Sequence, residues 1–351
     1  MSPVARALAA RGFEPLLLVT GQHPTLDLAD YGLGDFPAIR LDCPGEANPY
    51  SHARHIEERV RTELRRRPDL LIVQGDTSSA FGAAQAAFTS GVAVAHVEAG
   101  LRTHDPRLPW PEEEFRSAID SRALLLFAPT ALAAANLASE RITGAIHITG
   151  NSGIDFLLET VASLPPEPPR ASGHKRLLVT CHRRESWGSG LAEIADAVAA
   201  IAAAGDVRVE VVLHPNPVVA EPLRRRLGRL PGVELLAPMS HRDLVQRMRG
   251  CDLLMSDSGG IQEEAPALGV PLLILRDKTE RPEGVASGNS RLVGVKAERI
   301  VAEALALFGN PTERLAMASR AFPFGDGRSA PRIASIIEQW TRSKTRRSRA
   351  S

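Results

Sequence analysis

Cysteine, net charge and long apolar runs are all scarce in this chain of 351 residues. Its three cysteines are isolated and lack CxxC spacing, which argues against a disulfide framework or a zinc site and is typical of a reducing cytoplasm. The formal net charge is only +1, and the arginines are scattered. Because nucleic-acid binding needs a concentrated basic surface, we expect no nucleic-acid partner, and the cysteine pattern indicates no metal.

Apolar segments and glycine-rich signatures are missing too. A membrane-spanning helix needs about 20 consecutive apolar residues. No stretch approaches that length, and the N-terminus lacks a signal-peptide pattern. Neither GxxxxGK[ST] nor a GxGxxG after a strand occurs. The sequence therefore predicts a cytoplasmic protein with no membrane partner and no bound cofactor.

What the chain does contain is a regular alternation of short apolar runs with helical patterns. The runs are residues 15–20, 70–74, 92–97 and 124–128, and then 176–180, 207–214, 233–237, 252–256 and 271–275. Such alternation is typical of parallel strands joined by helical crossovers. The length suffices for two domains. We predict the α/β class, with two Rossmann-like, doubly wound domains facing a cleft.

Proline marks the expected boundary between these domains, in the stretch 164–173. The prediction is a first domain over 1–160 and a second over 174–322. A last helix over 323–342 is expected to cross back to the first domain. Residues 343–351 are basic and are expected to form a disordered tail.

An amphipathic helix is predicted over residues 51–67, with its apolar side chains at four-residue steps: Ile56, Val60 and Leu64. His52 and His55 lie on this helix without a third histidine or a carboxylate at metal-ligand spacing. We place both on its wet face. They are therefore not candidates for a site.

Acidic residues follow the strands of the first half. Asp76 comes after the run 70–74, Glu98 after the run 92–97, and Glu112 lies a little further on, after Pro111. Taken singly, Asp76 is more simply a helix N-cap and Glu112 a first-turn carboxylate. However, ligands of open parallel sheets bind beyond the carboxyl ends of the strands. Three acids at one such edge favour catalysis.

The second half supplies basic groups and a glycine turn at the equivalent places. His182 and Arg183 follow its first strand, His214 its second, Ser258–Gly260 its fourth and Arg281 its fifth. A glycine turn that opens a helix offers backbone amides and a favourable dipole to a phosphate. The same turn also serves as a plain strand-to-helix connection. The neighbouring cations favour a diphosphate.

Eight stretches together resemble one family. They are GDTSS, HVEAGLRT, PWPEE, TCHRRES, HPNP, DSGGIQEEAPALG, RDKTERPEG and GDG, in that order. In order and spacing they are similar to the non-hydrolysing bacterial UDP-N-acetylglucosamine 2-epimerases, over nearly the whole chain. The resemblance implies a glycosyltransferase-B-like arrangement of the two domains and a homodimer. It also implies an isomerase that acts on UDP-N-acetylglucosamine.

The reaction implied by the resemblance is reversible epimerisation at C2. UDP leaves C1 while a base removes the C2 proton, which gives a 2-acetamidoglucal. UDP then adds back with protonation of the other face, giving UDP-N-acetylmannosamine for cell-surface polysaccharide. This route is needed because no carbonyl acidifies the C2 proton.

The family's functional residues match positions in this sequence. The family's essential acids match Asp76, Glu98 and Glu112, and its essential histidine matches His182. Its diphosphate loop matches Ser258, Gly259 and Gly260. The acid that binds the ribose hydroxyls matches Glu264, and a phosphate contact matches Arg281. Gln22, Arg183 and His214 match a second, allosteric UDP-N-acetylglucosamine site present in some members. A further glutamine expected in that site is Thr25 here. Which acid serves which face of the sugar stays open.

The beginning of the sequence departs from the family. Members begin with a strand and a GTRPE-like loop whose arginine, followed by a lysine, approaches the substrate, whereas this sequence opens in a helix. We expect a start codon assigned too far downstream, or else a weakly active or unstable chain. Three alternatives to the epimerase stay open: a UDP-sugar glycosyltransferase of the same fold, a hydrolysing epimerase, and an inactive UDP-sugar sensor.

Overall fold

The computed structural model describes every residue except 23–25, 167–172, 182–187 and 351. Within the described residues, the chain divides into two compact units. The first unit comprises Met1–Phe156 and Phe324–Ser351, and the second comprises Leu157–Pro323. No described helix is long and apolar enough to cross a membrane.

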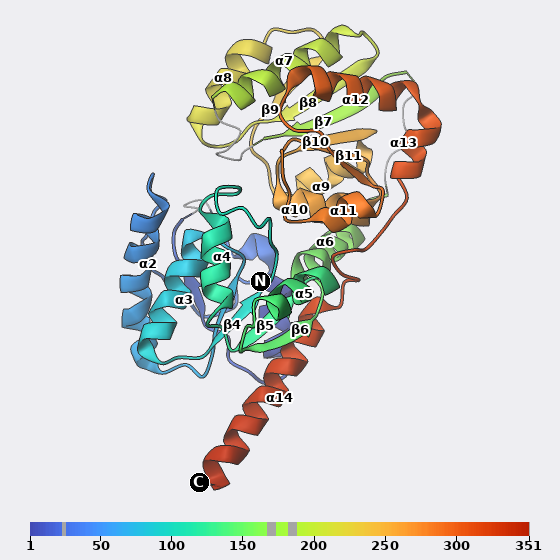
Figure 1. Cartoon of the computed structure of the whole chain (residues 1–351). Helices are drawn as coiled ribbons and strands as arrows, with labels where there is room; N and C mark the ends of the chain where they lie inside the picture. The colour runs from blue at the N-terminus through green and yellow to red at the C-terminus, as the bar shows by residue number, and fades with distance from the viewer. Residues whose placement is uncertain (23–25, 167–172, 182–187, 351) are drawn as a thin grey trace. The chain divides into compact units, whose positions relative to one another are not determined.

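The first unit alternates strands and helices along the chain (Figure 1). Its elements are α1 (Ser2–Ala9), β1 (Leu17–Val19), η1 (Ala29–Tyr31), β2 (Ala38–Arg40), α2 (Pro49–Glu63), η2 (Leu64–Arg66), β3 (Leu71–Gln74), α3 (Ser78–Ser90), β4 (Val94–Val97), α4 (Glu112–Asp120), β5 (Leu125–Ala128), α5 (Ala131–Ser139), β6 (Ala145–Ile148), α6 (Ser152–Ser163) and α14 (Ser329–Ala350). The chain first passes into the second unit within α6.

All strand pairs of the first unit are parallel, in two sheets. β1 pairs with β2, and the order of the larger sheet is β3-β4-β5-β6. In that sheet Gln74 lies opposite Val97, so the segments after β3 and β4 leave the sheet side by side. These segments carry Asp76 and Glu98.

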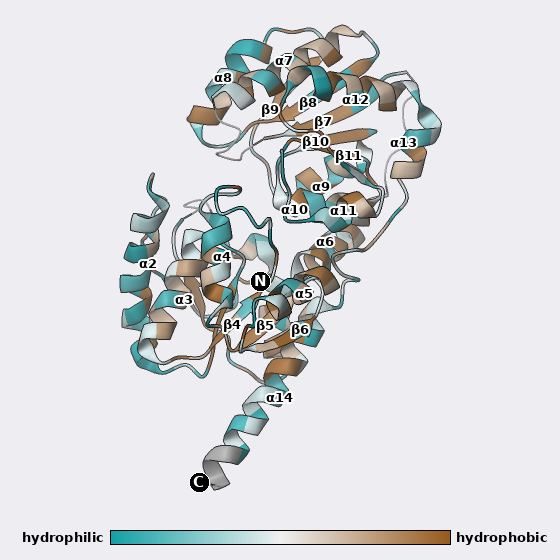
Figure 2. Cartoon of the chain, in the orientation of Figure 1, coloured by the Kyte–Doolittle hydropathy of each residue, from teal (hydrophilic) through white to brown (hydrophobic). Residues whose placement is uncertain are grey.

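Helices cover both faces of the larger sheet. α2 and α3 contribute to one apolar cluster, while α1 and α14 contribute to another that includes Val97 and Phe127. Such two-sided burial explains why the strands are continuous apolar runs rather than alternating ones. The hydropathy colouring shows α2 mostly hydrophilic along the side turned from the sheet (Figure 2).

The second unit contains one parallel sheet of six strands, in the order β12-β11-β10-β7-β8-β9. Its elements are β7 (Lys175–Thr180), α7 (Ser189–Ala203), β8 (Val207–Val212), α8 (Pro217–Leu227), β9 (Val233–Leu236), α9 (His241–Gly250), β10 (Leu253–Ser256), α10 (Gly259–Leu268), β11 (Leu272–Ile274), α11 (Pro282–Ala286), β12 (Ser290–Leu292), α12 (Ala297–Gly309) and α13 (Pro311–Met317). This order is the Rossmann order, with its reversal point between β7 and β10. The predicted α/β class is confirmed.

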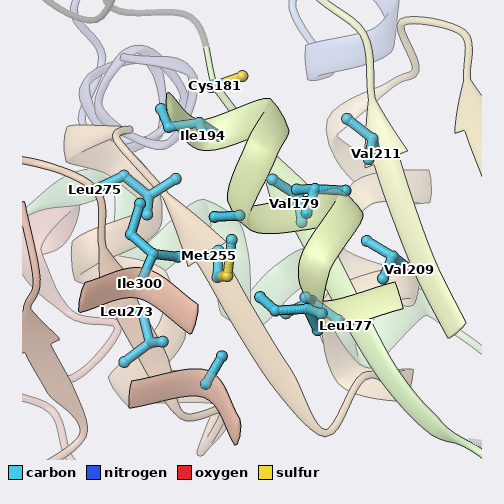
Figure 3. Close-up of a cluster of buried hydrophobic side chains, with 14 of the residues drawn as sticks. Leu177, Val179, Cys181, Ile194, Val209, Val211, Met255, Leu273, Leu275 and Ile300 are labelled. Atoms are coloured by element: carbon cyan, nitrogen blue, oxygen red, sulfur yellow. The ribbon is translucent and has the colours of Figure 1, made fainter. Parts of the chain in front are cut away.

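The core of the second unit is built where β7, β8 and β10 meet α7 and α12. Val179, Ile194, Met255 and Ile300 point toward one another there (Figure 3). Burying each such side chain contributes about 1.5–3 kcal/mol. This core fixes the carboxyl ends of β7 and β10, and the turn that carries Ser258–Gly260 follows β10.

Strand predictions were correct for the long apolar runs and incomplete for the short ones. Each predicted run contains a strand, whereas β2, β6 and β12 were not predicted. These three strands are only three or four residues long and partly exposed, so they carry little apolar signal. They lie at or next to sheet edges, where pairing rather than hydrophobicity determines the strand.

Two other expectations were wrong. His52 is buried and bonds to the Cys43 carbonyl oxygen at 3.1 Å, because it lies one turn before Ile56 on the apolar face of α2. The tail is helical as far as Ala350, as a continuation of α14. Lys344 Nζ lies 3.1 Å from Asp69 Oδ1, and basic side chains in the last turns of a helix are favoured by its dipole.

Candidate active site

Asp76 lies just after β3 and is held by a buried arginine. The N-cap of α3 is Thr77, whose side chain accepts the Ala80 amide, so Asp76 is not the predicted capping residue. Instead, Asp76 Oδ2 accepts hydrogen bonds from Nε of Arg116, at 3.1 Å, and from Nη2. Helix capping therefore does not explain the presence of an acid at position 76.

Arg116 belongs to α4 and connects three segments of the site. Besides Asp76, it donates to the Leu101 carbonyl oxygen at 3.0 Å and to Glu113 Oε2 at 2.7 Å. Oε1 of Glu113 accepts the backbone amides of Thr103 and His104, at 2.9 and 3.0 Å. The segments after β3 and β4 are thus both tied to α4.

Glu98 stands at the end of β4 in a conformation that few non-glycine residues adopt. Its φ is +71°, and its amide and that of Ala99 both donate to the Phe127 carbonyl oxygen. A left-handed φ in a residue of this kind costs on the order of 1 kcal/mol or more and is commonest at functional sites. Gln74 Nε2 donates to Glu98 Oε2 at 3.3 Å. Glu98 is therefore positioned by both neighbouring strands.

Glu112 begins α4, as the predicted first-turn carboxylate, with Pro111 as the N-cap. The helix dipole stabilises a negative charge at this end. Glu112 lies one turn before Arg116, the residue that binds Asp76. The structure therefore places Asp76 and Glu98 on neighbouring strand ends, with Glu112 on the helix that is bound to Asp76.

A buried network around His96 of β4, which sequence reasoning missed, supports this edge of the sheet. His96 Nε2 lies 2.9 Å from the Gly75 carbonyl oxygen, and its Nδ1 lies 2.6 Å from Asp120 Oδ1. Asp120 also pairs with Arg102 at 2.9 Å. Burial alone would raise the pKa of Asp120, but His96 and Arg102 together outweigh burial and hold that pKa below its ordinary value. The network fixes the peptide that precedes Asp76.

In the second unit, the turn after β10 seats the N-terminus of α10. Ser258 is the N-cap, and its hydroxyl accepts the Ile261 amide at 3.5 Å. Gly260 is exposed, and a Cβ added to it would meet no protein atom closer than 4.0 Å. Its φ is not positive, so neither packing nor backbone conformation requires glycine there. A glycine that the protein itself does not need is consistent with close approach by a ligand.

Glu264 lies one turn along α10 from Gly260 and is oriented by a histidine. His241, the first residue of α9, places Nε2 2.8 Å from Glu264 Oε1. Glu263, next to it, faces elsewhere and pairs with Arg281 at 2.6 Å. Glu264 is therefore the partly exposed acid of this pair, and Glu263 is structural.

Arg281 lies in a closed group of charges rather than at an open surface. It pairs with Glu263 and with Glu280, and Glu280 also pairs with Arg276 at 3.0 Å. All four side chains are buried. In this arrangement Arg281 anchors the loop before α11, and the phosphate contact expected for it stays a prediction.

The allosteric candidates are described only in part. Gln22, in the first unit, accepts the Ser79 hydroxyl at 2.6 Å. His214, in the second, accepts the Asn216 amide at 3.0 Å. His182 and Arg183 lie outside the described residues. The described part of the chain holds no group of three or more His, Cys, Asp or Glu side chains suited to a metal.

Comparison with known proteins gives a consistent result. Residues 6–338 match the family model described as UDP-N-acetylglucosamine 2-epimerase. The chain is similar to the UDP-N-acetylglucosamine 2-epimerase of Salmonella typhimurium, at 38% identity over 97% of this chain and 95% of that protein. It also resembles the crystal structure of UDP-GlcNAc 2-epimerase from Neisseria meningitidis bound to UDP-GlcNAc, at 32% identity and a TM-score of 0.89, covering 97% of this chain and 96% of that one.

A further structure, the UDP-GlcNAc 2-epimerase of Methanocaldococcus jannaschii in complex with UDP-GlcNAc and UDP, is 30% identical, with a TM-score of 0.86, over 96% of this chain and 95% of that one. The parallel sheets and these likenesses define an α/β enzyme with Rossmann-like units. Within that class, the chain belongs to the UDP-N-acetylglucosamine 2-epimerase family. The resemblance noted in the sequence is confirmed.

Proposed function

We propose that this chain interconverts UDP-N-acetylglucosamine and UDP-N-acetylmannosamine by eliminating UDP and adding it back. The observation that carries the proposal is the pair of acids, Asp76 and Glu98, on the neighbouring ends of β3 and β4. Family membership and neighbours that bind UDP-GlcNAc support the choice of substrate. The product would supply N-acetylmannosamine units for cell-surface polysaccharide, and we expect the enzyme to be a cytoplasmic homodimer.

The carboxylates of the first unit would handle the C2 proton. The base takes the proton from C2, the C2–H electron pair forms the C1–C2 double bond, and the C1–O bond breaks to release UDP. Protonation of C2 on the other face and re-addition of UDP at C1 give the epimer. General acid–base groups contribute about 10² to 10⁴ each, which suits Asp76, Glu98 and Glu112 in these roles.

The second unit would hold the nucleotide. The amides at Gly259 and Gly260 suit the diphosphate, both in the substrate and as the leaving group. The Ser258 amide donates to the Ser256 hydroxyl oxygen at 3.0 Å, so Ser258 takes part as the N-cap of this turn. Glu264, oriented by His241, suits the ribose hydroxyls. His182 and Arg281 are proposed beside the diphosphate by their match to the family. Gln22, Arg183 and His214 are proposed for a second UDP-GlcNAc.

Incubation with UDP-N-acetylglucosamine in D₂O tests the proposal. We expect deuterium at C2 of both nucleotide sugars, measured by NMR, with no net loss of either sugar to hydrolysis. Free N-acetylmannosamine would identify a hydrolase instead. UDP binding without exchange at C2 would identify a UDP-sugar sensor, and transfer of the sugar to an acceptor a glycosyltransferase.

A further inference from the structure

Arg116 is among the largest fully buried side chains described, with 1% of its side chain exposed. A buried guanidinium is costly unless carboxylates and carbonyl groups satisfy it. Glu113 and the Leu101 carbonyl oxygen accept from Nη1 alone. Nε and Nη2 both donate to Asp76, which is the less buried of its two acidic partners.

The contacts on Asp76 are one-sided. Both donors of Arg116 bind Oδ2, and within the described part of the chain Oδ1 accepts no hydrogen bond. The Asp76 side chain is 22% exposed, whereas that of Glu113 is 6% exposed and bonded at both oxygens. The guanidinium therefore fixes the carboxylate by one oxygen and leaves the other oxygen available.

We propose that Arg116 is a positioning residue for this reaction, which holds Asp76 so that Oδ1 is presented to the sugar. The inference rests on the proposed function. Since Arg116 is buried, it does not touch the substrate and acts through Asp76. Glu113 neutralises the buried charge of Arg116, and Asp76 is the carboxylate that Arg116 positions.

The planar fork of arginine makes this role specific. Two donors on one oxygen set both the position and the rotation of the carboxylate, which a lysine ammonium cannot reproduce. Displacing a catalytic group by about 1 Å costs on the order of 10²-fold in rate. Arg116→Lys should therefore lower kcat about 100-fold, while KM for UDP-N-acetylglucosamine and Kd for UDP change less than about twofold.

A double-mutant cycle tests whether Arg116 acts through Asp76. Rates of deuterium exchange at C2 are measured for the wild-type chain, Arg116→Lys, Asp76→Asn and the double variant. If the proposal holds, Arg116→Lys changes the rate of Asp76→Asn less than about twofold, since residues that act as a unit are non-additive. If Arg116→Lys lowered the exchange rate as much in the Asp76→Asn variant as in the wild-type chain, the proposal would be overturned.

Two further variants separate positioning from folding. In Arg116→Gln with Glu113→Gln the arginine and its structural counter-charge are removed together, and the same loss of kcat is expected if Arg116→Lys fails to fold. Arg314→Lys is the matched control, because Arg314 is a partly buried arginine paired with Asp252 at 2.7 Å in the second unit. Its activity should be unchanged.

The outcomes distinguish this inference from the proposed function. A wild-type chain that binds UDP without exchange at C2 refutes the proposed function and this inference with it. An active wild type combined with an additive cycle refutes only the role of Arg116. A loss in Arg116→Lys that appears in KM rather than kcat would make Arg116 a binding or folding residue, against the proposal.

Discussion

Each unit places a buried arginine between two carboxylates near the carboxyl ends of its strands, and the two arrangements differ in exposure. In the first unit Arg116 pairs with Asp76, whose side chain is 22% exposed. In the second, Arg281 pairs with Glu263 and Glu280, whose side chains are 5% and 0% exposed. The first group presents a charged side chain at the surface. The second group is buried and presents almost none of these charges to solvent.

This difference is the basis for a division of labour that we propose between the two units. Beside its buried charges, α10 of the second unit offers exposed backbone at Gly260 and a partly exposed acid, Glu264. Backbone amides suit a group that is bound throughout the reaction, such as a diphosphate. Carboxylates suit proton transfer. Substitutions in the first unit should therefore change the chemical step, and substitutions in the second should change nucleotide binding or folding.

The largest effect is expected from Glu98→Gln. The amide preserves the shape of the side chain but cannot take or give the proton, so kcat should fall by about 10² to 10⁴. The Kd for UDP, measured by calorimetry, should stay within about twofold. Glu57→Gln, on the outer face of α2 where Glu57 pairs with Arg61, is the control and should leave both quantities unchanged. A Glu98→Gln enzyme with normal kcat would remove Glu98 from the mechanism.

Breaking the closed charge group should affect stability instead. Arg281→Met leaves Glu263 and Glu280 buried without this partner, and loss of one member of a buried ion pair costs about 3–5 kcal/mol. Urea unfolding measures this free energy. Arg224→Met, which breaks the exposed pair with Glu221, should cost about 0–1 kcal/mol. Unchanged stability with weaker UDP binding would leave Arg281 only the phosphate contact that its match to the family implies, without the structural role.

Glu264→Ala tests the partly exposed acid of α10. Hydrogen bonds to a charged group contribute about 1.5–3 kcal/mol, so the Kd for UDP should rise about 10- to 100-fold. The Kd for UDP-N-acetylglucosamine should rise with it. Glu221→Ala, at an exposed acid on α8, should leave both constants unchanged. If Glu264→Ala binds UDP normally, Glu264 does not bind the ribose.

Gly260→Ala is expected to give the smallest change. The added Cβ has room in the folded protein, and replacing glycine by alanine in a helix gains up to about 1 kcal/mol. The methyl group should nevertheless obstruct the diphosphate and weaken UDP binding roughly tenfold, or about 1.4 kcal/mol. Gly309→Ala, at the last residue of α12, is equally open and should gain stability without affecting UDP. Equal UDP binding by both variants would contradict the proposal that the turn Ser258–Gly260 binds the diphosphate.

Much of the fold could be predicted because its signals are local. Long apolar runs predicted every strand that carries a candidate residue, and the rule that ligands lie beyond strand carboxyl ends selected Asp76 and Glu98. The short strand β6 escaped because its partly exposed residues lack a strong apolar pattern. The helical tail also escaped, because composition alone does not reveal that a basic segment continues a packed helix.

The supports of the site could not be predicted, because they depend on contacts between distant segments. Arg116 is 40 residues from Asp76, and His241 is 23 residues from Glu264. Nothing near either residue in the sequence indicates its partner. Taken singly, Asp76 was interpreted as the N-cap of α3, whereas the structure shows that Thr77 is the cap.

The most direct test of the division of labour compares Glu98→Gln and Gly260→Ala in two assays: deuterium exchange at C2 with saturating substrate, and Kd for UDP. The account predicts that Glu98→Gln loses exchange and keeps its Kd, while Gly260→Ala keeps exchange and loses affinity. If Glu98→Gln weakened UDP binding as much as exchange, or Gly260→Ala lowered exchange without changing the Kd, the two units would not divide the work in this way.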